Sequence, residues 1–154
     1  MATYESTQYT SGVTNSTANE PHVRNGVQCA YARFTGQALS SSDSVNMLKI
    51  PSGSRIITPN SVLIASDLES SATINIGFGE HSKQSDGSTV SADADAFISA
   101  VAADSARTET RFTESTTYDT GYVTDGEVTI TLALGAGTSV AADTFDMFVE
   151  YIKA

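Results

Sequence analysis

The sequence predicts an all-β protein: an antiparallel β-sandwich or jelly roll of about eight strands, with one short helix at about residues 94–106 and an extended N-terminal arm. Three observations predict this fold class. Several segments alternate between apolar and polar residues, which is the period of a half-buried strand. Turn sequences containing Gly, Pro, Asn-Gly or Asp-Gly separate those segments. Ser and Thr replace many of the charged residues, which make up only 17% of the chain, and Thr suits a pleated strand.

The stretch from Ser54 to Gly79 carries the clearest strand signal. Its first part, residues 55–65, reads as one strand interrupted at Pro59-Asn60. A polar turn at 67–71 follows, and residues 72–78 then alternate. Three large apolar side chains share one face of that last segment: Ile74, Ile76 and Phe78. Because consecutive strands usually lie side by side, we expect a hairpin that forms the spine of the sandwich.

The remaining strands are predicted from the same signals. Cys29 falls inside the strand predicted at 27–35, and we expect a buried thiol there, because the chain has no second cysteine for a disulfide. Residues 107–117 are polar and Thr-rich, which suggests an edge strand. Asp125-Gly126 is a hairpin turn signal, so the segments on either side of it are expected to pair. The predicted strands outside the central stretch are Val27–Thr35, Val45–Ile50, Arg107–Thr117, Tyr118–Val123, Glu127–Leu134 and Thr144–Lys153.

One segment has helical rather than strand periodicity. Residues 80–95 read as a long polar loop with a turn at Asp86-Gly87. After that loop, Phe97, Ile98 and Val101 stand at helical spacing. An aspartate just before them, Asp93 or Asp95, suits a helix N-cap. These residues are the basis for the short helix at 94–106.

The charge argues against several partners. Residues 1–77 hold four basic and five acidic residues (net −1), and residues 78–154 hold four and thirteen (net −9), which together give the net charge of −10. With no basic patch, the sequence argues against direct nucleic-acid binding. The N-terminus lacks the basic start and apolar run of a secretory signal, and no apolar segment approaches the ~20 residues that cross a bilayer. We expect a soluble protein made in the cytoplasm, without membrane contact.

The residues that could carry chemistry do not form a recognisable site. The two histidines, His22 and His81, lie in polar contexts, and no Gly-x-Ser-x-Gly elbow accompanies the serines. Asp93 and Asp95 form the nearest approach to a metal motif, but apolar residues follow them where a calcium loop needs ligands. The glycines at 77–79 and 135–137 read as turns rather than a phosphate loop. We expect no enzymatic activity, no cofactor and no metal.

The first 26 residues differ in composition from the rest of the chain. They contain no Leu, Ile or Phe and are rich in Thr, Ser and Asn. Ordering a residue costs about 1–2 kcal/mol, which so few apolar side chains cannot offset. We therefore expect an N-terminal arm (1–26) that is held by a neighbouring subunit, followed by a sandwich domain (27–154); the alternative is an arm that folds along its own sandwich. The candidate partner-binding residues are Tyr4, Tyr9, Val13, His22, Val23 and Arg24.

The central stretch resembles a run found in small structural proteins of tailed bacteriophages. The resemblance rests on Lys49-Ile50-Pro51-x-Gly53-x-Arg55-Ile56, on Val62-Leu63-Ile64-Ala65-x-Asp67 and on Ala72 to Gly77. Asp95-Ala96-Phe97 and the closing Phe148 to Ile152 are also similar, so that the resemblance spans residues 27–153. The motifs are structural, and they supply no catalytic residues.

Proteins of this family are jelly-roll or sandwich modules of the virion, often trimeric capsid decoration (cement) proteins. The resemblance implies a homotrimer that docks on the outer surface of the phage head, with the major capsid protein and copies of itself as partners. Two alternatives stay open. One is a head–tail or tail accessory structural protein; the other is a carbohydrate- or receptor-binding module, against which the lack of Trp counts.

Overall fold

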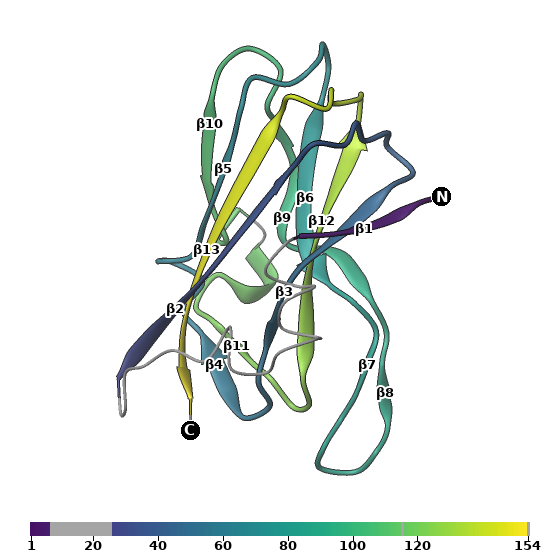
Figure 1. Cartoon of the computed structure of the whole chain (residues 1–154). Helices are drawn as coiled ribbons and strands as arrows, with labels where there is room; N and C mark the ends of the chain where they lie inside the picture. Colours follow the sequence, from purple (N-terminus) through teal and green to yellow (C-terminus); the bar gives the residue numbers. More distant parts are fainter. Residues whose placement is uncertain (7–25, 115, 154) are drawn as a thin grey trace.

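A computed structural model describes residues 1–6, 26–114 and 116–153 (Figure 1). This part of the chain has thirteen strands and one 3-10 turn, η1 (Thr116–Tyr118). Eleven of the strands form a two-layered sandwich, and β7 and β8 form a separate hairpin, which confirms the all-β prediction. The strands are β1 (Thr3–Glu5), β2 (Val27–Thr35), β3 (Ser44–Ile50), β4 (Ser54–Ile56), β5 (Val62–Ala65), β6 (Thr73–Phe78), β7 (His81–Ser82), β8 (Thr89–Val90), β9 (Asp93–Ala102), β10 (Thr108–Arg111), β11 (Tyr122–Val123), β12 (Val128–Ala136) and β13 (Thr144–Lys153).

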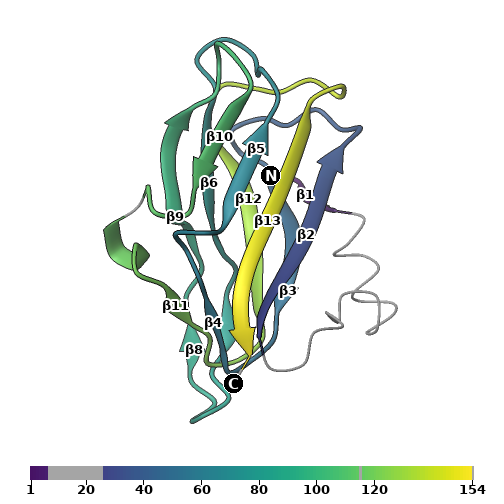
Figure 2. The same ribbon diagram turned by 90° about the vertical axis from the view of Figure 1, so that its left-hand side faces the viewer.

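The two layers are formed by different sets of strands. Sheet A has the order β1-β3-β12-β6-β9, and sheet B has the order β10-β5-β13-β4-β11 with β2 also paired to β13. In sheet B, β4 and β5 pair with successive stretches of the same side of β13, so they lie end to end (Figure 2). The strand predicted to be interrupted at Pro59-Asn60 is therefore confirmed. The opposite side of β13 pairs with β2 over its whole length.

The core lies between the sheets and is filled by the alternating residues that the sequence indicates. Along β12 and β13 every second side chain is buried, as predicted. Burying each large apolar side chain contributes about 1.5–3 kcal/mol. These two strands supply eight buried side chains: Val128, Ile130, Leu132, Leu134, Phe145, Met147, Val149 and Tyr151.

Both predicted hairpins are wrong. β5 belongs to sheet B and β6 to sheet A, so the chain crosses between layers at residues 66–72 instead of turning back. Likewise β11 pairs with β4, whereas β12 pairs with β3 and β6. Alternation shows which side chains enter the core, but both sheets face the same core. The pattern is therefore identical for a hairpin and for a crossover.

The predicted helix at 94–106 is also wrong, because the segment forms β9. Ile76 of β6 pairs with Ile98 of β9, whereas Phe78, two residues further on, pairs with Asp93. The stretch of β9 between these two partners is longer than the stretch of β6, so extra residues bulge out of the ladder. The bulges place Ala96, Phe97 and Ile98 in the core consecutively. Phe97 stacks on Phe112 at 5.3 Å between ring centroids. A bulged strand loses its period of two, and the remaining spacing imitates a helix.

The two predicted glycine turns lie partly inside strands. Gly77 is in β6 and Gly135 is in β12. Of these glycine segments, only Gly137, just after β12, has a positive φ (73°). Residues 80–95, predicted as a loop, contain the short β7–β8 hairpin, whose connection includes Gly87 at φ 72°.

Candidate interaction surfaces

The first residues of the chain lie on the edge of sheet A. β1 pairs in parallel with β3, and the Ser6 amide donates to the Asn46 carbonyl at 3.0 Å. The Asp43 carboxylate accepts from the Ala2 amide at 2.9 Å and from the Ser40 amide at 3.0 Å. The hydrogen bonds from Ser40 and Ala2 lower the pKa of Asp43. Residues 1–6 thus fold along their own sandwich, which is the alternative that the sequence left open.

Tyr4 is the one candidate partner-binding residue that the structure describes. Its half-buried ring packs against Phe34 of the same chain, with 6.1 Å between centroids. The other five lie outside the described residues: Tyr9, Val13, His22, Val23 and Arg24. Their role in binding a neighbouring subunit, and the boundary between arm and domain at residue 26, stay predictions.

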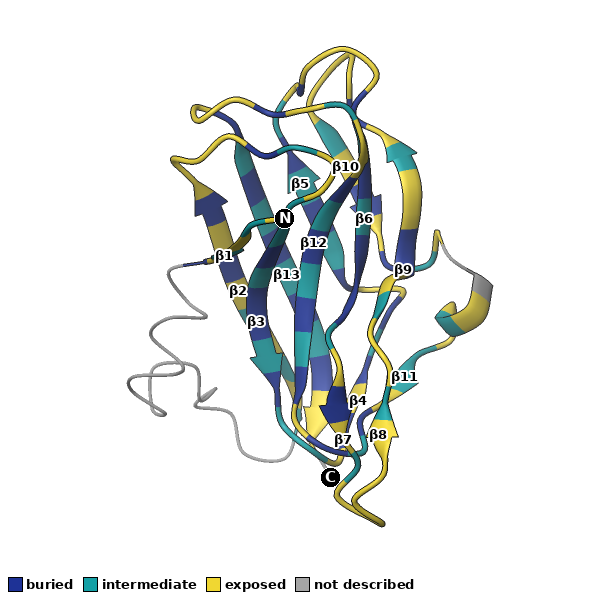
Figure 3. Cartoon of the chain, turned by 90° about the vertical axis from the view of Figure 1, so that its right-hand side faces the viewer, coloured by how far each residue is buried: buried dark blue, intermediate teal, exposed yellow. Residues whose placement is uncertain are grey.

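The two outer faces of the sandwich differ in chemistry. On sheet A the residues that alternate with the core include Thr129, Thr131 and Asn75, whose side chains are small and polar. Figure 3 shows the alternation of buried and half-buried positions along β12. Lys49 and Glu127 form an ion pair at 2.8 Å on the same sheet. On sheet B the corresponding positions include exposed Tyr31 and half-buried Phe148 and Ile64. Sheet B therefore presents the apolar outer surface.

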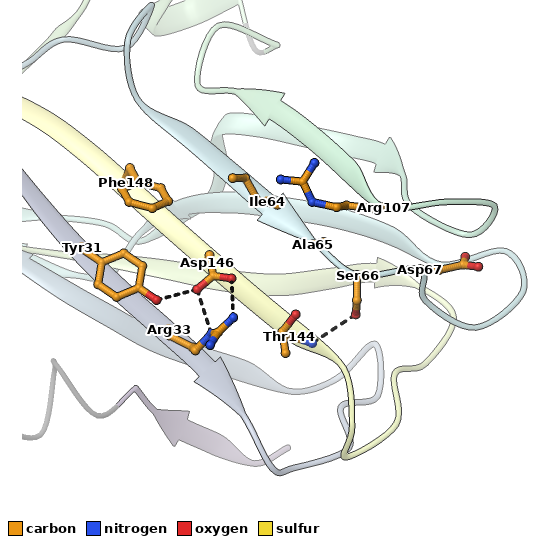
Figure 4. A pocket seen from close by; sticks show the side chains of 10 residues that line it. All are labelled: Tyr31, Arg33, Ile64, Ala65, Ser66, Asp67, Arg107, Thr144, Asp146 and Phe148. Atoms are coloured by element: carbon orange, nitrogen blue, oxygen red, sulfur yellow. Dashed lines mark hydrogen bonds and ion pairs between the residues drawn. The ribbon is translucent and has the colours of Figure 1, made fainter.

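A depression of about 640 Å³ lies on this outer face of sheet B (Figure 4). Strand register explains its floor: Tyr31 and Arg33 of β2 lie beside Phe148 and Asp146 of β13, and Asp146 lies beside Ile64 of β5. The Tyr31 and Phe148 rings are 4.9 Å apart and tilted by 39°. The lining residues are Tyr31, Arg33, Ile64, Ala65, Ser66, Asp67, Arg107, Thr144, Asp146 and Phe148.

Asp146 organises the polar side of the depression. The Tyr31 hydroxyl donates to Asp146 Oδ1 at 2.6 Å. Arg33 contacts the same carboxylate through Nε at 2.9 Å and Nη2 at 3.1 Å. The hydrogen bond to Asp146 raises the pKa of Tyr31. Tyr31, Arg33 and Asp146 therefore hold one another in place on an exposed sheet surface.

Arg107, just before β10, is the basic group of this depression that has no counter-ion among the described residues. Its guanidinium has no hydrogen bond or ion pair with any residue in the described part of the chain. In Figure 4 it extends towards Ile64, whereas the Asp67 carboxylate points to the opposite end. An arginine beside apolar side chains suits a carboxylate that arrives with an apolar neighbour.

Cys29 lies on the same outer face, and the prediction of a buried thiol is wrong. Its side chain is exposed because β2 is an edge strand whose odd-numbered residues point outward. Partial burial and the nearby Glu150 raise the pKa of the thiol. The strand predicted at 27–35 is confirmed, but the face of it that carries Cys29 points to solvent rather than into the core.

The described residues contain no group of three or more His, Cys, Asp or Glu side chains arranged to hold a metal ion. His81 is buried against Phe78, with Nδ1 3.0 Å from the Gly79 carbonyl oxygen. Across residues 1–6, 26–114 and 116–153, no helix is long and apolar enough to cross a membrane. Sequence reasoning did not find the depression, because Arg107, Phe148 and Tyr31 come together only through strand pairing.

Comparison with known proteins finds similar structures at low sequence identity. No protein-family model and no curated protein matches the chain. A chain from the capsid of Ralstonia phage GP4 matches with a TM-score of 0.68 at 15% identity, over 99% of this chain and 98% of that chain. This chain shares the fold of that capsid chain. A chain from the cyanophage Pam1 capsid matches at TM-score 0.54 and 20% identity, over 88% and 91% of the two chains. One from the capsid of Helicobacter pylori bacteriophage KHP30 matches at 0.52 and 12%, over 86% and 92%.

Proposed function

We propose that the protein is a non-enzymatic structural component of a phage virion: a capsid decoration (cement) protein that docks on the outside of the head and clamps neighbouring capsid subunits as a homotrimer. The likeness to the GP4 capsid chain carries this proposal. It extends over 99% of this chain and 98% of the other at a TM-score of 0.68. A fold can host unrelated functions, so we rest the proposal on the extent of the match, which leaves out almost no part of either chain.

The strand order supports the jelly-roll interpretation. Leaving aside the separate β7–β8 hairpin, and counting β4 with β5 and β10 with β11 as single positions, gives eight strands from β2 to β13. Sheet B then contains the first, eighth, third and sixth strands, and sheet A contains the second, seventh, fourth and fifth. Such an interleaved order is what two Greek keys produce in a jelly roll.

The N-terminal arm is the part that we propose to clamp the neighbour. An extended segment supplies contact area at up to ~3.3 Å per residue, and a strand added to a neighbour's sheet gains backbone hydrogen bonds. The described chain is fixed on both sides of residues 7–25, by β1 and by β2. Tyr9 suits the main anchor of that segment, because tyrosine is enriched among interface hot spots, and Val13 and Val23 add apolar contact area.

Binding to shells that lack the protein tests this role. The triple variant Tyr9→Ser, Val13→Ser and Val23→Ser should lower occupancy on the shell about tenfold, the loss expected when apolar anchors are removed. Thr10→Ser, Thr14→Ser and Thr17→Ser form a matched control in the same segment and should bind as the natural chain does. Full occupancy by the first variant would refute the arm's role; no binding by the natural chain would refute the decoration function.

The alternative placement, on the tail or the head–tail connector, is distinguished by copy number. Hundreds of copies per particle would support the head, and six or twelve would support the tail. A carbohydrate-binding module would present open ring faces. Here the Tyr31 and Phe148 rings contact each other, and the Tyr31 hydroxyl is bonded to Asp146, so we favour this alternative less.

A further inference from the structure

The edge of β3 is a site that a single added strand fills. We call residues 43–47 of this edge the β3 edge site. β1 occupies it in parallel register, with backbone hydrogen bonds at both ends. The Ser44 amide donates to the Ala2 carbonyl at 3.0 Å, and the Ser6 amide donates to the Asn46 carbonyl at 3.0 Å.

Side chains of β1 also seal the sandwich beside this site. The half-buried Tyr4 ring packs against Phe34 at 6.1 Å between centroids, and Phe34, which is 4% exposed, packs against Phe145 at 6.3 Å. The Ser6 hydroxyl, on a residue that is 1% exposed, donates to the Met47 carbonyl. Without β1 the Phe34 ring would be exposed, and an open strand edge is a template for pairing with another chain. The β3 edge site therefore favours being occupied by a strand.

None of these contacts depends on which chain supplies the strand. Within one chain, residues 7–26 connect β1 to β2. Tyr4 lies beside Phe34, near the end of β2, whereas the connection must return to Val27 at its start. Those positions are 34 − 27 = 7 residues apart, which is about 23 Å at ~3.3 Å per residue. The connection has 26 − 6 = 20 residues and can extend to about 66 Å. It is therefore much longer than the return to its own β2 requires.

We propose that residues 1–6 are exchanged between copies of this chain, so that β1 of one copy occupies the β3 edge site of a second copy. Exchange of an identical element is a low-cost route to an oligomer, because each exchanged strand makes the contacts that it makes in its own chain. Head-to-tail exchange closes into a ring when the rotation allows it. The inference rests on the proposed function, because it names the strand and the site by which the arm holds a neighbouring subunit.

Concentration decides between the two arrangements. A flexible connection holds a tethered segment at an effective concentration in the millimolar range, which falls as the connection grows beyond the distance that it must span. β1 contains only three residues, and an element with few contacts opens at low free energy. We therefore expect β1 in its own site in dilute solution. Where copies are crowded, as neighbours on a shell are, β1 occupies the site of the next copy.

Oxidation of a paired-cysteine variant of the full chain tests the exchange. Thr3 and Ser44 are partners in the β1–β3 register, and adjacent strands lie about 4.8 Å apart, within the Cα separation that a disulfide bridges. In a Cys29→Ser background, Thr3→Cys combined with Ser44→Cys should form closed monomers at micromolar concentration. At millimolar concentration the same variant should form covalent multimers on a denaturing gel without reductant. Closed monomers at both concentrations would overturn the proposal.

A mixture of single variants keeps the test decisive if the double variant does not fold. Chains with Thr3→Cys and chains with Ser44→Cys, both in the Cys29→Ser background, can form the mixed disulfide only between copies. In the control, Gln84→Cys on the exposed β7–β8 connection replaces Ser44→Cys and measures random collision. The mixed disulfide, identified by mass spectrometry, should form at least about tenfold faster with Ser44→Cys than with Gln84→Cys, because pairing holds the two thiols together. Equal rates would show that β1 does not reach the site of another copy.

Failure of this inference is distinguishable from failure of the proposed function. If the concentrated double variant gives only closed monomers while the natural chain still binds shells, the exchange is wrong and the decoration function stands. If covalent multimers form but the natural chain binds no shell or tail, the exchange stands and the decoration function is wrong.

Discussion

Gly77 shows how one residue fixes the distance between two strands. A Cβ atom on Gly77 would lie 1.9 Å from the Asp93 carbonyl oxygen and 2.5 Å from the Ala94 carbonyl carbon. Both are backbone atoms of β9, so no side chain can rotate away to make room. The bulged course of β9 past β6 therefore requires glycine at this position.

We predict that Gly77→Ala destabilises the fold by about 3 kcal/mol, the upper part of the usual range for overpacking. Gly79→Ala is the matched control, because a Cβ there would meet only ordinary contacts at 3.9–4.0 Å. It should cost less than about 1 kcal/mol. Urea unfolding of the two variants measures the difference, and equal midpoints would contradict the argument.

Side-chain direction was predictable where strands are regular. In β13, Phe145, Met147, Val149 and Tyr151 follow strict alternation, and all are buried. The candidate site was much less predictable. Tyr31 lies in the strand predicted at 27–35, but its contact with Phe148 and the proximity of Arg107 depend on pairing between residues far apart in sequence. Period alone carries no information about such pairing.

At the scale of an element, β1 is the least secured strand of sheet A. It contains three residues and pairs with β3 alone. Its start depends on Asp43, whose carboxylate bonds the amides of Ala2 and Ser40. Elements with few contacts open at low free energy. The attachment of the arm to its own domain therefore rests on a small number of hydrogen bonds.

Asp43→Ala should release β1 while leaving the sandwich folded. Without the charge-assisted hydrogen bond to the Ala2 amide, β1 should open more often, so amide exchange at Ser6 should accelerate about tenfold. Asp104→Ala is the control: it removes a carboxylate that bonds the Ser71 amide in a different loop. Hydrogen exchange resolved to single residues measures the exchange rate of the Ser6 amide in both variants. Unchanged protection of Ser6 would show that β1 is held by its ladder with β3.

The sequence predicts some strands correctly and misses others. The strand at 27–35 and the interrupted strand at 55–65 follow from the sequence, because their alternation is undisturbed. The strand β9 does not, since its bulges turn three consecutive residues inward. Strand partners were missed for a different reason: β6 and β5 bury side chains in one shared core, and sequence period cannot tell which sheet a strand joins.

For the molecule as a whole, we expect solubility and the stability of the fold to be lost at different pH values during acidification. The sequence pI is about 4.3. Three loop aspartates have pKa values lowered mainly by hydrogen bonds: Asp43 from Ser40, Asp86 from Ser88 and Asp125 from Ser85. A lowered pKa contributes stability that is present above the ordinary value of 3.8 and is lost as the pH falls through the lowered one. Asp93 acts in the opposite direction, because burial raises its pKa.

We therefore predict that acidification precipitates the protein before it unfolds it. Near pH 4.3 the net charge vanishes, so repulsion between molecules is lost, while the three aspartates still hold their loops. Light scattering should rise there with the near-ultraviolet circular dichroism unchanged, and the dichroism should fall only below pH 3.8. Replacing Asp43, Asp86 and Asp125 by Asn should make the second transition shallower, because fewer protons are then taken up on unfolding. Loss of dichroism at or above the pH of precipitation would mean that other carboxylates control the fold.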